Sequence, residues 1–318
     1  MNARQTATDA QLDGVVQRVL SVYKRWGRST TVAQMRADWD ALFGVDSVEA
    51  QVTPVAIGAL GSLGALSGEW ITAPAATAAR STVLYFHGGG FQVGSVHSHR
   101  ELMAGISAAT CCRVLGVDYR LAPEHRYPAA LEDASASYDW LLAQGVPPGE
   151  IVLAGDSAVG NVVLAALLQL RDAGRPLPAG AVLMSAWTDM SASGDSYATR
   201  AASDPIHQRP MILAMARNYL CAEGDARHPW VSPLFAELHG LPPLLIQVGD
   251  RETVLGDSVA FAEKARAAGV TVQLEVWDRM IHVFQQFPDA LPEALDARRS
   301  IGAFVRALLP QPPLTRKS

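Results

Sequence analysis

The stretch from Ile151 to Asn161 constrains the fold of this chain more than any other part of the sequence. Residues 151–154 are apolar and predict a buried strand, which ends at Gly155. A second apolar run, long enough for a helix, begins directly after Ser157. The sequence therefore predicts a strand and a helix joined by a sharp turn with a serine at its apex, the arrangement of a nucleophile elbow. Such a turn lifts the hydroxyl clear of the sheet, and the first turn of the helix supplies N–H groups that favour negative charge.

The match to the Gly-x-Ser-x-Gly pattern of this elbow is incomplete. Val159 stands where the pattern has its second glycine. The hypothesis that Ser157 is a catalytic nucleophile therefore needs support from other parts of the chain.

Length and charge narrow the range of functions. With 318 residues, of which 49% are hydrophobic, the chain can form one large α/β domain or a domain with a lid. The net charge is −5 and no basic block is present, so nucleic acid is not an expected partner.

The sequence also carries signals about the compartment. Three cysteines, Cys111, Cys112 and Cys221, do not suggest a disulfide framework, and reduced thiols in a cytoplasm are the simpler interpretation. The first residues show no apolar secretion signal, and no apolar stretch reaches the length of a membrane span. We therefore expect a soluble, cytoplasmic protein.

Most of the chain alternates between predicted strands and helices. Strands are expected at 81–86, 113–119, 151–154, 181–186, 244–248 and 270–277, after antiparallel strands within 48–72. Helices are expected at 98–110, 129–143, 158–170, 257–268 and 292–309. This alternation predicts an α/β fold with a mostly parallel sheet and helices on both faces.

Two segments do not follow this alternation. The apolar spacing predicts N-terminal helices at 9–26 and 31–42, which either pack for stability or form part of a lid. Residues 188–233, with a helix at 210–220, are typical of an insertion above the sheet. The prolines of the tail at 310–318 cannot continue a helix, so we expect this tail to be flexible.

A glycine-rich loop follows the strand at 81–86. It reads His87-Gly88-Gly89-Gly90, and three successive glycines are costly in entropy and need a reason. A phosphate cradle would require a lysine or a different glycine spacing. A tight turn remains possible, but the loop lies where an elbow-type hydrolase places its oxyanion hole, with N–H groups of Gly88 and Gly89 as donors.

A histidine and an acid complete the candidate catalytic set. In elbow-type hydrolases the order along the chain is serine, acid, histidine, and His282 follows the last strand as this order requires. The acid should follow the strand ending near Val248, where it would orient the imidazole. Asp250, Glu252 and Asp257 all lie there, and periodicity does not choose among them.

Four motifs together resemble bacterial esterases of the hormone-sensitive-lipase type, within the α/β-hydrolase superfamily. They are His87-Gly88-Gly89-Gly90; Tyr119-Arg120-Leu121-Ala122-Pro123-Glu124 with Pro128-Ala129-Ala130 and Glu132-Asp133; Gly155-Asp156-Ser157-Ala158; and Ile281-His282-Val283-Phe284. The resemblance extends over roughly residues 45 to 309 and implies a mostly parallel eight-stranded sheet flanked by helices, with a helical cap. Residues 46–187 and 234–309 would form the catalytic domain, and 1–45 and 188–233 the cap.

The resemblance also selects an acid. In such enzymes the acid opens an Asp-Pro-Leu triplet, which falls here on Glu252-Thr253-Val254. Glu252 is thus the expected acid, and Asp257 takes the place of the family's second carboxylate, at a helix start. Glutamate is one methylene longer than aspartate and must retract to reach His282.

The reaction implied is hydrolysis of short- to medium-chain carboxylic esters through an acyl-enzyme, without a metal or cofactor. Gly88, Gly89 and Ala158 would donate N–H groups to the oxyanion. Phe91, Trp187, Ile206 and Ile281 are expected pocket walls. Val159 either is absorbed by smaller neighbours, narrows the acyl pocket, or marks an engineered chain.

The expected partner is a small-molecule ester, and the resemblance alone suggests a homodimer. Two alternatives remain open. One is an amidase or deacetylase that acts on small acylated compounds. The other is a non-catalytic ligand-binding protein on the same fold.

Overall fold

The computed structural model describes residues 6–27, 29–58, 65–77, 79–221 and 224–310. The flexible tail expected at 310–318 therefore lies, apart from its first residue, outside the described residues.

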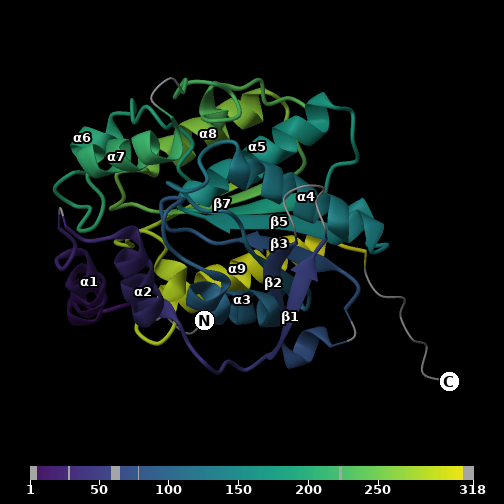
Figure 1. Ribbon diagram of the computed structural model, residues 1–318, viewed down its shortest axis with the longest axis horizontal. Helices are drawn as coiled ribbons and strands as arrows, with labels where there is room; N and C mark the ends of the chain where they lie inside the picture. The colour runs from purple at the N-terminus through teal and green to yellow at the C-terminus, as the bar shows by residue number, and fades with distance from the viewer. Residues whose placement is uncertain (1–5, 28, 59–64, 78, 222–223, 311–318) are drawn as a thin grey trace.

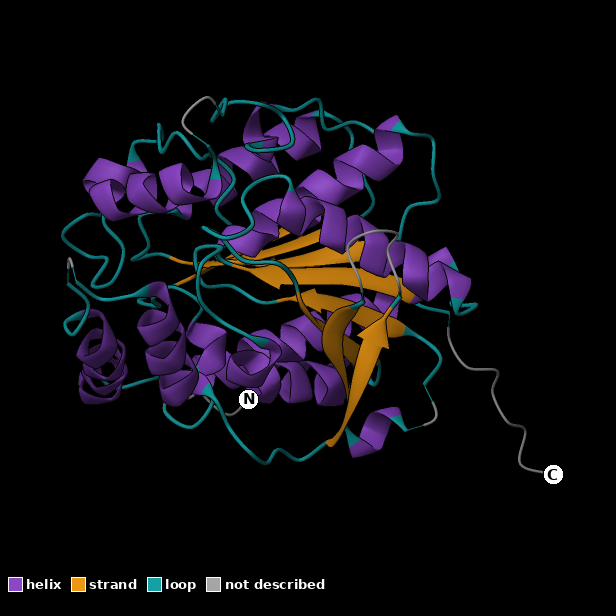
Figure 2. Ribbon diagram, in the orientation of Figure 1, coloured by secondary structure: helices purple, strands orange, loops and turns teal. Residues whose placement is uncertain are grey.

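Eight strands form one twisted sheet in the order β1-β2-β4-β3-β5-β6-β7-β8 (Figure 2). β3 to β8 are parallel, whereas β2 pairs antiparallel with β4, and β1 with β2. The strands are β1 (Gln51–Ile57), β2 (Leu66–Thr72), β3 (Thr82–Phe86), β4 (Arg113–Asp118), β5 (Ile151–Asp156), β6 (Gly180–Met184), β7 (Leu244–Gly249) and β8 (Val272–Trp277). The predicted fold class, an eight-stranded and mostly parallel sheet, is confirmed.

The central strands are apolar along their whole length because helices cover both faces of the sheet. Every residue of β3, β5, β6 and β7 is buried. α3 (Val96–Thr110) and α9 (Pro292–Leu308) pack together on one face, and α4 (Ala129–Ala143), α5 (Ala158–Asp172) and α8 (Leu255–Ala267) cover the other (Figure 1). Two large apolar clusters, one on each face, form the core.

The two segments outside the alternation lie on the same side of the molecule (Figure 1). α1 (Asp9–Tyr23) and α2 (Val32–Phe43) come from the N-terminus, and α6 (Ser196–Thr199) and α7 (Arg209–Tyr219) from the insertion. α1 ends three residues before the predicted end at Trp26, and the short α6 was not predicted. Side chains from α1, α2 and α7 line one pocket together with Ser157, so these helices cover the edge of the sheet from which the serine projects.

Candidate active site

Ser157 occupies a strained turn between β5 and α5. Its backbone has φ 57° and ψ −132°, a conformation that costs a non-glycine residue on the order of 1–3 kcal/mol. Two hydrogen bonds to the neighbouring strand end hold the turn: the Ser157 N–H donates to the Met184 carbonyl at 2.8 Å, and the Trp187 N–H donates to the Ser157 carbonyl at 3.1 Å. The surrounding sheet therefore imposes the elbow that the sequence predicts.

Val159 does not disturb this elbow, because the close approach of helix and sheet occurs one residue later. A Cβ on Gly160 would lie 2.7 Å from the Cβ of Ala186. Val159 itself is fully buried in the core and does not line the pocket. The expectation that Val159 is a pocket residue is therefore wrong, and its side chain is absorbed by the apolar packing around α5.

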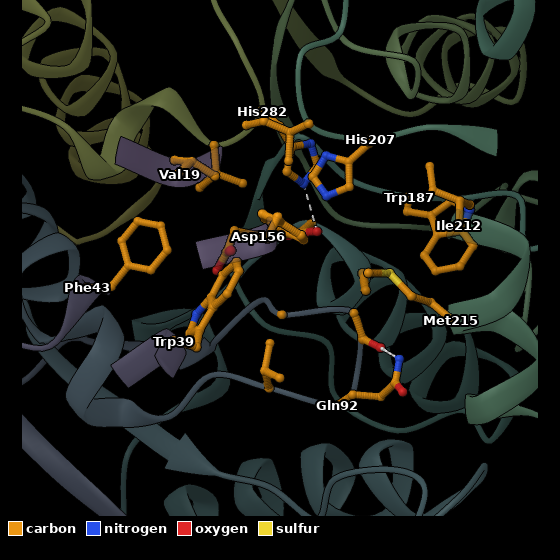
Figure 3. A pocket seen from close by; sticks show the side chains of 18 of the residues that line it. Val19, Trp39, Phe43, Gln92, Asp156, Trp187, His207, Ile212, Met215 and His282 are labelled. Atoms are coloured by element: carbon orange, nitrogen blue, oxygen red, sulfur yellow. Dashed lines mark hydrogen bonds between the residues drawn. The ribbon is translucent and has the colours of Figure 1, made fainter. Parts of the chain in front are cut away.

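His282 joins the serine to the acid. Its Nε2 lies 2.8 Å from Ser157 Oγ, and its Nδ1 lies 2.7 Å from Glu252 Oε2. In Figure 3 His282 lies above the pocket, and a dashed line marks its hydrogen bond to Ser157. Residues from three separate strand ends thus form one continuous chain of hydrogen bonds.

Glu252 is fully buried and folds back onto its own loop. Its Oε1 accepts the Gly249 N–H at 2.5 Å and the Ser185 hydroxyl at 2.8 Å. Ser185 Oγ in turn accepts the Val283 N–H at 3.0 Å, next to the histidine. These contacts accommodate the extra methylene of the glutamate.

The other two acids that the sequence left open lie elsewhere. Asp257 accepts the N–H groups of Thr188 and Asp189, at 2.9 Å each, and the Tyr197 hydroxyl. Burial, followed by the neighbouring Asp189 carboxylate, raises the pKa of Asp257 to about 8. No hydrogen bond joins Asp250 to His282, so among the carboxylates of the described residues only Glu252 reaches the imidazole.

The charges around His282 favour its protonated form. Burial lowers the pKa of His282, but the Glu252 carboxylate, together with the more distant Asp204 and Asp156, raises it by more. The net result is a pKa above the ordinary value of 6.5. An imidazolium formed at this position is therefore stabilised, as general base catalysis requires.

The structure of the glycine loop contradicts one of the predicted oxyanion donors. The Gly88 N–H donates to Asp156 Oδ1 at 2.9 Å, so the prediction of Gly88 as a donor to substrate is wrong. The N–H groups of Gly89, Gly90 and Ala158 have no acceptor among the described residues, and all three residues line the pocket. Gly89 has φ 122°, and a Cβ there would lie 2.2 Å from the Val93 carbonyl, so only glycine fits.

The pocket beside Ser157 is small and largely apolar, with a volume of about 60 Å³. Aromatic side chains from the N-terminal segment form one wall, and α7 contributes Ile212 and Met215 (Figure 3). Trp187 and Ile206, both expected pocket residues, line it. The aromatic wall consists of Tyr23, Trp26, Trp39 and Phe43.

Two further expected pocket residues lie in the core instead. Phe91 stacks on Tyr219 with ring centroids 3.7 Å apart and is fully buried. Ile281 packs in the cluster formed by α1, α9 and the histidine loop. The prediction that Phe91 and Ile281 line the pocket is wrong, because both side chains point into apolar packing rather than toward the serine.

Sequence reasoning did not identify Gly90, Ser185, His207 and the aromatic residues of α1 and α2. Their roles depend on the directions of side chains and N–H groups, which a linear motif does not give. Within the described ranges, no group of three or more His, Cys, Asp or Glu side chains could hold a metal ion. No helix in the described part of the chain is both long and apolar enough to cross a membrane.

Known proteins share this sequence and this architecture. Residues 83–286 match the family described as alpha/beta hydrolase fold. An acetyl-hydrolase of Streptomyces hygroscopicus is 45% identical over 245 residues, 77% of this chain and 81% of the relative. An esterase of Acinetobacter venetianus is 38% identical over 246 residues, 77% of this chain and 80% of the relative. The crystal structure of an esterase from the bacterial hormone-sensitive lipase family has a TM-score of 0.88 and 41% identity, covering 96% of this chain and all of the other.

The fold and the relatives are those of serine hydrolases. The chain belongs to the α/β-hydrolase fold family and, within it, to the esterases of the bacterial hormone-sensitive-lipase type. The sequence-based expectations of the family, the fold and an ester hydrolase are confirmed.

Proposed function

We propose that Ser157, His282 and Glu252 form the catalytic triad of this esterase. The observation that carries the proposal is the unbroken chain from Glu252 Oε2 through the imidazole to Ser157 Oγ, with links of 2.7 and 2.8 Å. Gly89, Gly90 and Ala158 would donate N–H groups to the oxyanion, since they border the pocket and have no acceptor among the described residues.

The proposed reaction proceeds through an acyl-enzyme. His282 Nε2 takes the proton of Ser157 while the serine oxygen attacks the ester carbonyl, and the three N–H groups stabilise the oxyanion. The protonated His282 then gives its proton to the leaving alcohol as the carbon–oxygen bond breaks. In the second half, His282 takes a proton from water, the hydroxide attacks the acyl carbon, and the proton returns to Ser157 as the acid leaves.

We propose short- to medium-chain acyl groups as substrates. A cavity of about 60 Å³ holds only a handful of water-sized groups at about 10–15 Å³ each. The name acetyl-hydrolase given to the Streptomyces relative is consistent with a small acyl group.

We propose that residues 1–45 and 188–233 act together as a cap over this pocket. The described parts of both segments contribute pocket walls, with Tyr23 and Trp39 from the first and Ile206 and Met215 from the second. The acyl or alcohol group would therefore be held between the cap and the catalytic domain.

We also propose a cytoplasmic location and a homodimer. Cys111, Cys112 and Cys221 are all free thiols, which suits a reducing compartment. β8 is an edge strand with Val276 47% exposed, a surface on which a second copy could pair. Sedimentation of the purified protein would decide between monomer and dimer.

A hydrolysis screen with p-nitrophenyl esters from acetate to palmitate tests the proposed substrate class. We expect the largest kcat/KM at acetate to hexanoate and little turnover at palmitate. A maximum at long chains would contradict the assignment of chain length. Absence of turnover with every ester, at full folding, would contradict the catalytic assignment itself.

A further inference from the structure

His207 is a polar residue of the pocket wall that takes no part in the triad. His207 belongs to the segment between α6 and α7 and lines the pocket beside His282 (Figure 3). The two ring centroids are 4.2 Å apart, and the planes meet at 63°. Its contact with the catalytic imidazole is the feature that distinguishes His207.

The backbone of His207 is fixed independently of its ring. Its N–H donates to Asp204 Oδ1 at 2.9 Å. The same carboxylate accepts the Thr253 N–H at 2.8 Å and the Thr253 hydroxyl at 3.0 Å through its other oxygen. Asp204 thus connects this segment to the loop that carries the triad acid, and the imidazole nitrogens are not needed to hold the segment in place.

Neither imidazole nitrogen of His207 has a hydrogen-bond partner among the described residues. Nδ1 is buried and forms no hydrogen bond, and no hydrogen bond joins Nε2 to any residue in the described ranges. Leaving a buried polar group unpaired is unfavourable, whereas an apolar ring of similar size would fill this space without that cost. The arrangement therefore suits a ligand that supplies the missing hydrogen bond.

His207 is a neutral imidazole, which has one donor and one acceptor nitrogen. Burial, followed by the charge of His282, lowers the pKa of His207 to about 3. A further unpaired nitrogen, Nε2 of Gln286, belongs to another residue of the same pocket wall. Neutral hydrogen-bonding groups in a largely apolar wall match an uncharged polar group such as a hydroxyl.

The position of His207 indicates which part of the ester it would contact. In the proposed reaction His282 Nε2 delivers a proton to the leaving alcohol oxygen, so the alcohol part lies on the His282 side of the pocket. His207 contacts the His282 ring there. A hydroxyl one or two carbons beyond the ester oxygen would lie near its nitrogens.

We propose that His207 is a specificity-determining residue that binds a hydroxyl group on the alcohol part of the ester, so that partial esters of diols and polyols are preferred substrates. This proposal rests on the proposed function and deepens it. An ester of the same shape that lacks the hydroxyl should be a poorer substrate, because it leaves the His207 imidazole without a hydrogen bond.

The test compares 2-hydroxyethyl butyrate with its isostere propyl butyrate. The ratio of the two kcat/KM values is measured in the wild type, in His207→Phe, which keeps an aromatic ring beside Tyr23 and His282, and in His207→Gln, which can still donate and accept. His239→Phe, at an exposed position, is the matched control. Comparing ratios between variants cancels the intrinsic difference in reactivity of the two esters.

We expect the wild type and His239→Phe to favour the hydroxyethyl ester about tenfold, His207→Phe to lose this preference, and His207→Gln to recover part of it. If thermal unfolding shows that His207→Phe does not fold, His207→Leu replaces it. An unchanged ratio in the folded ring-replacing variant, whatever its absolute rates, would overturn the proposal. Failure of the wild type to hydrolyse either ester would instead contradict the proposed function.

Discussion

At the scale of single residues, the proposed chemistry depends on how Glu252 holds the imidazole. Its two oxygens divide their contacts, one to His282 and the other to Gly249 and Ser185. In Glu252→Gln a neutral amide replaces the carboxylate that orients the imidazole and stabilises its positive charge. We expect kcat for a short ester to fall by on the order of 10³- to 10⁴-fold, measured at saturating substrate.

Two matched variants accompany this measurement. Asp250→Asn and Asp257→Asn remove the other carboxyl groups of the same region, and neither side chain is within hydrogen-bond reach of His282 in the described structure. Both should retain kcat within about threefold, because the interactions made in the transition state are unchanged. Near-full activity in Glu252→Gln, or a collapse in Asp257→Asn, would refute Glu252 as the acid.

A second prediction at the residue scale concerns Val159. Because it is buried in the core and not in the pocket, Val159→Gly should leave the order of preference among acyl lengths unchanged. It should lower the free energy of unfolding by roughly 2–4 kcal/mol, through the lost core volume and the poorer helix propensity of glycine. Urea unfolding and an acyl-length profile check both points, and a shifted profile at unchanged stability would place Val159 in the pocket after all.

At the scale of secondary structure elements, Arg36 joins α2 to the loops that follow β3 and β4. The guanidinium donates to the carbonyls of Gln92 and Ala122 at 2.8 and 3.1 Å and pairs with Glu124. Trp39, three residues further along the same helix, lines the pocket. The position of the aromatic wall therefore depends on this side chain.

Arg36→Ala should loosen α2 without touching the triad. We expect KM for a short ester to rise several-fold with kcat little changed, and the free energy of unfolding to fall by about 1–2 kcal/mol. Arg25→Ala removes a more exposed pair with Asp38 and serves as the comparison. A fall in kcat alone would show that α2 does not position the substrate wall.

The elements themselves were largely predictable from the sequence. β3, β5, β6 and β7 are continuous apolar runs because both of their faces are buried, and such runs bounded by turns indicate strands of a parallel sheet. The ends of elements were less predictable. β6 ends at Met184, one residue before Ser185, whose φ of 52° cannot be recognised from its residue type.

Site residues could be predicted where their order along the chain identifies them. They could not be predicted where their role depends on the direction in which a side chain points. Ser157 and His282 follow from their places after strands. The choice between Gly88 and Gly90 as a donor depends on the side chain of Asp156, which takes the Gly88 N–H. Phe91, next to the glycines, turns into the core and stacks on Tyr219 more than a hundred residues away.

At the scale of the whole molecule, the buried carboxyl of Asp257 should make folding stability depend on pH. Its pKa is raised from 3.8 to about 8 by burial and then by Asp189, so the folded state keeps a proton that the unfolded state releases near pH 4. Between about pH 4 and pH 8 the unfolded chain therefore binds fewer protons than the folded protein. The free energy of unfolding falls as pH rises through this interval, by up to about 1.4 kcal/mol per pH unit. The stabilisation that protonated Asp257 gives to the folded state is fully present below about pH 4 and lost by about pH 8.

Asp257→Asn removes this titration while keeping an oxygen for the N–H groups of Thr188 and Asp189. Urea unfolding of both proteins at a series of pH values between about 5 and 8 should give a clearly shallower pH dependence for the variant. Parallel curves would show that Asp257 is ionised in the folded protein.

The central claim is that Ser157 is a nucleophile activated by His282, and covalent labelling tests it most directly. The purified protein is titrated with a p-nitrophenyl phosphonate ester, and the released nitrophenol and the mass of the intact protein are followed. We expect one phosphonyl group per chain, located by peptide mass spectrometry on Ser157, and none in Ser157→Ala. The absence of an adduct in the folded wild type, or an adduct on a different residue, would contradict the account.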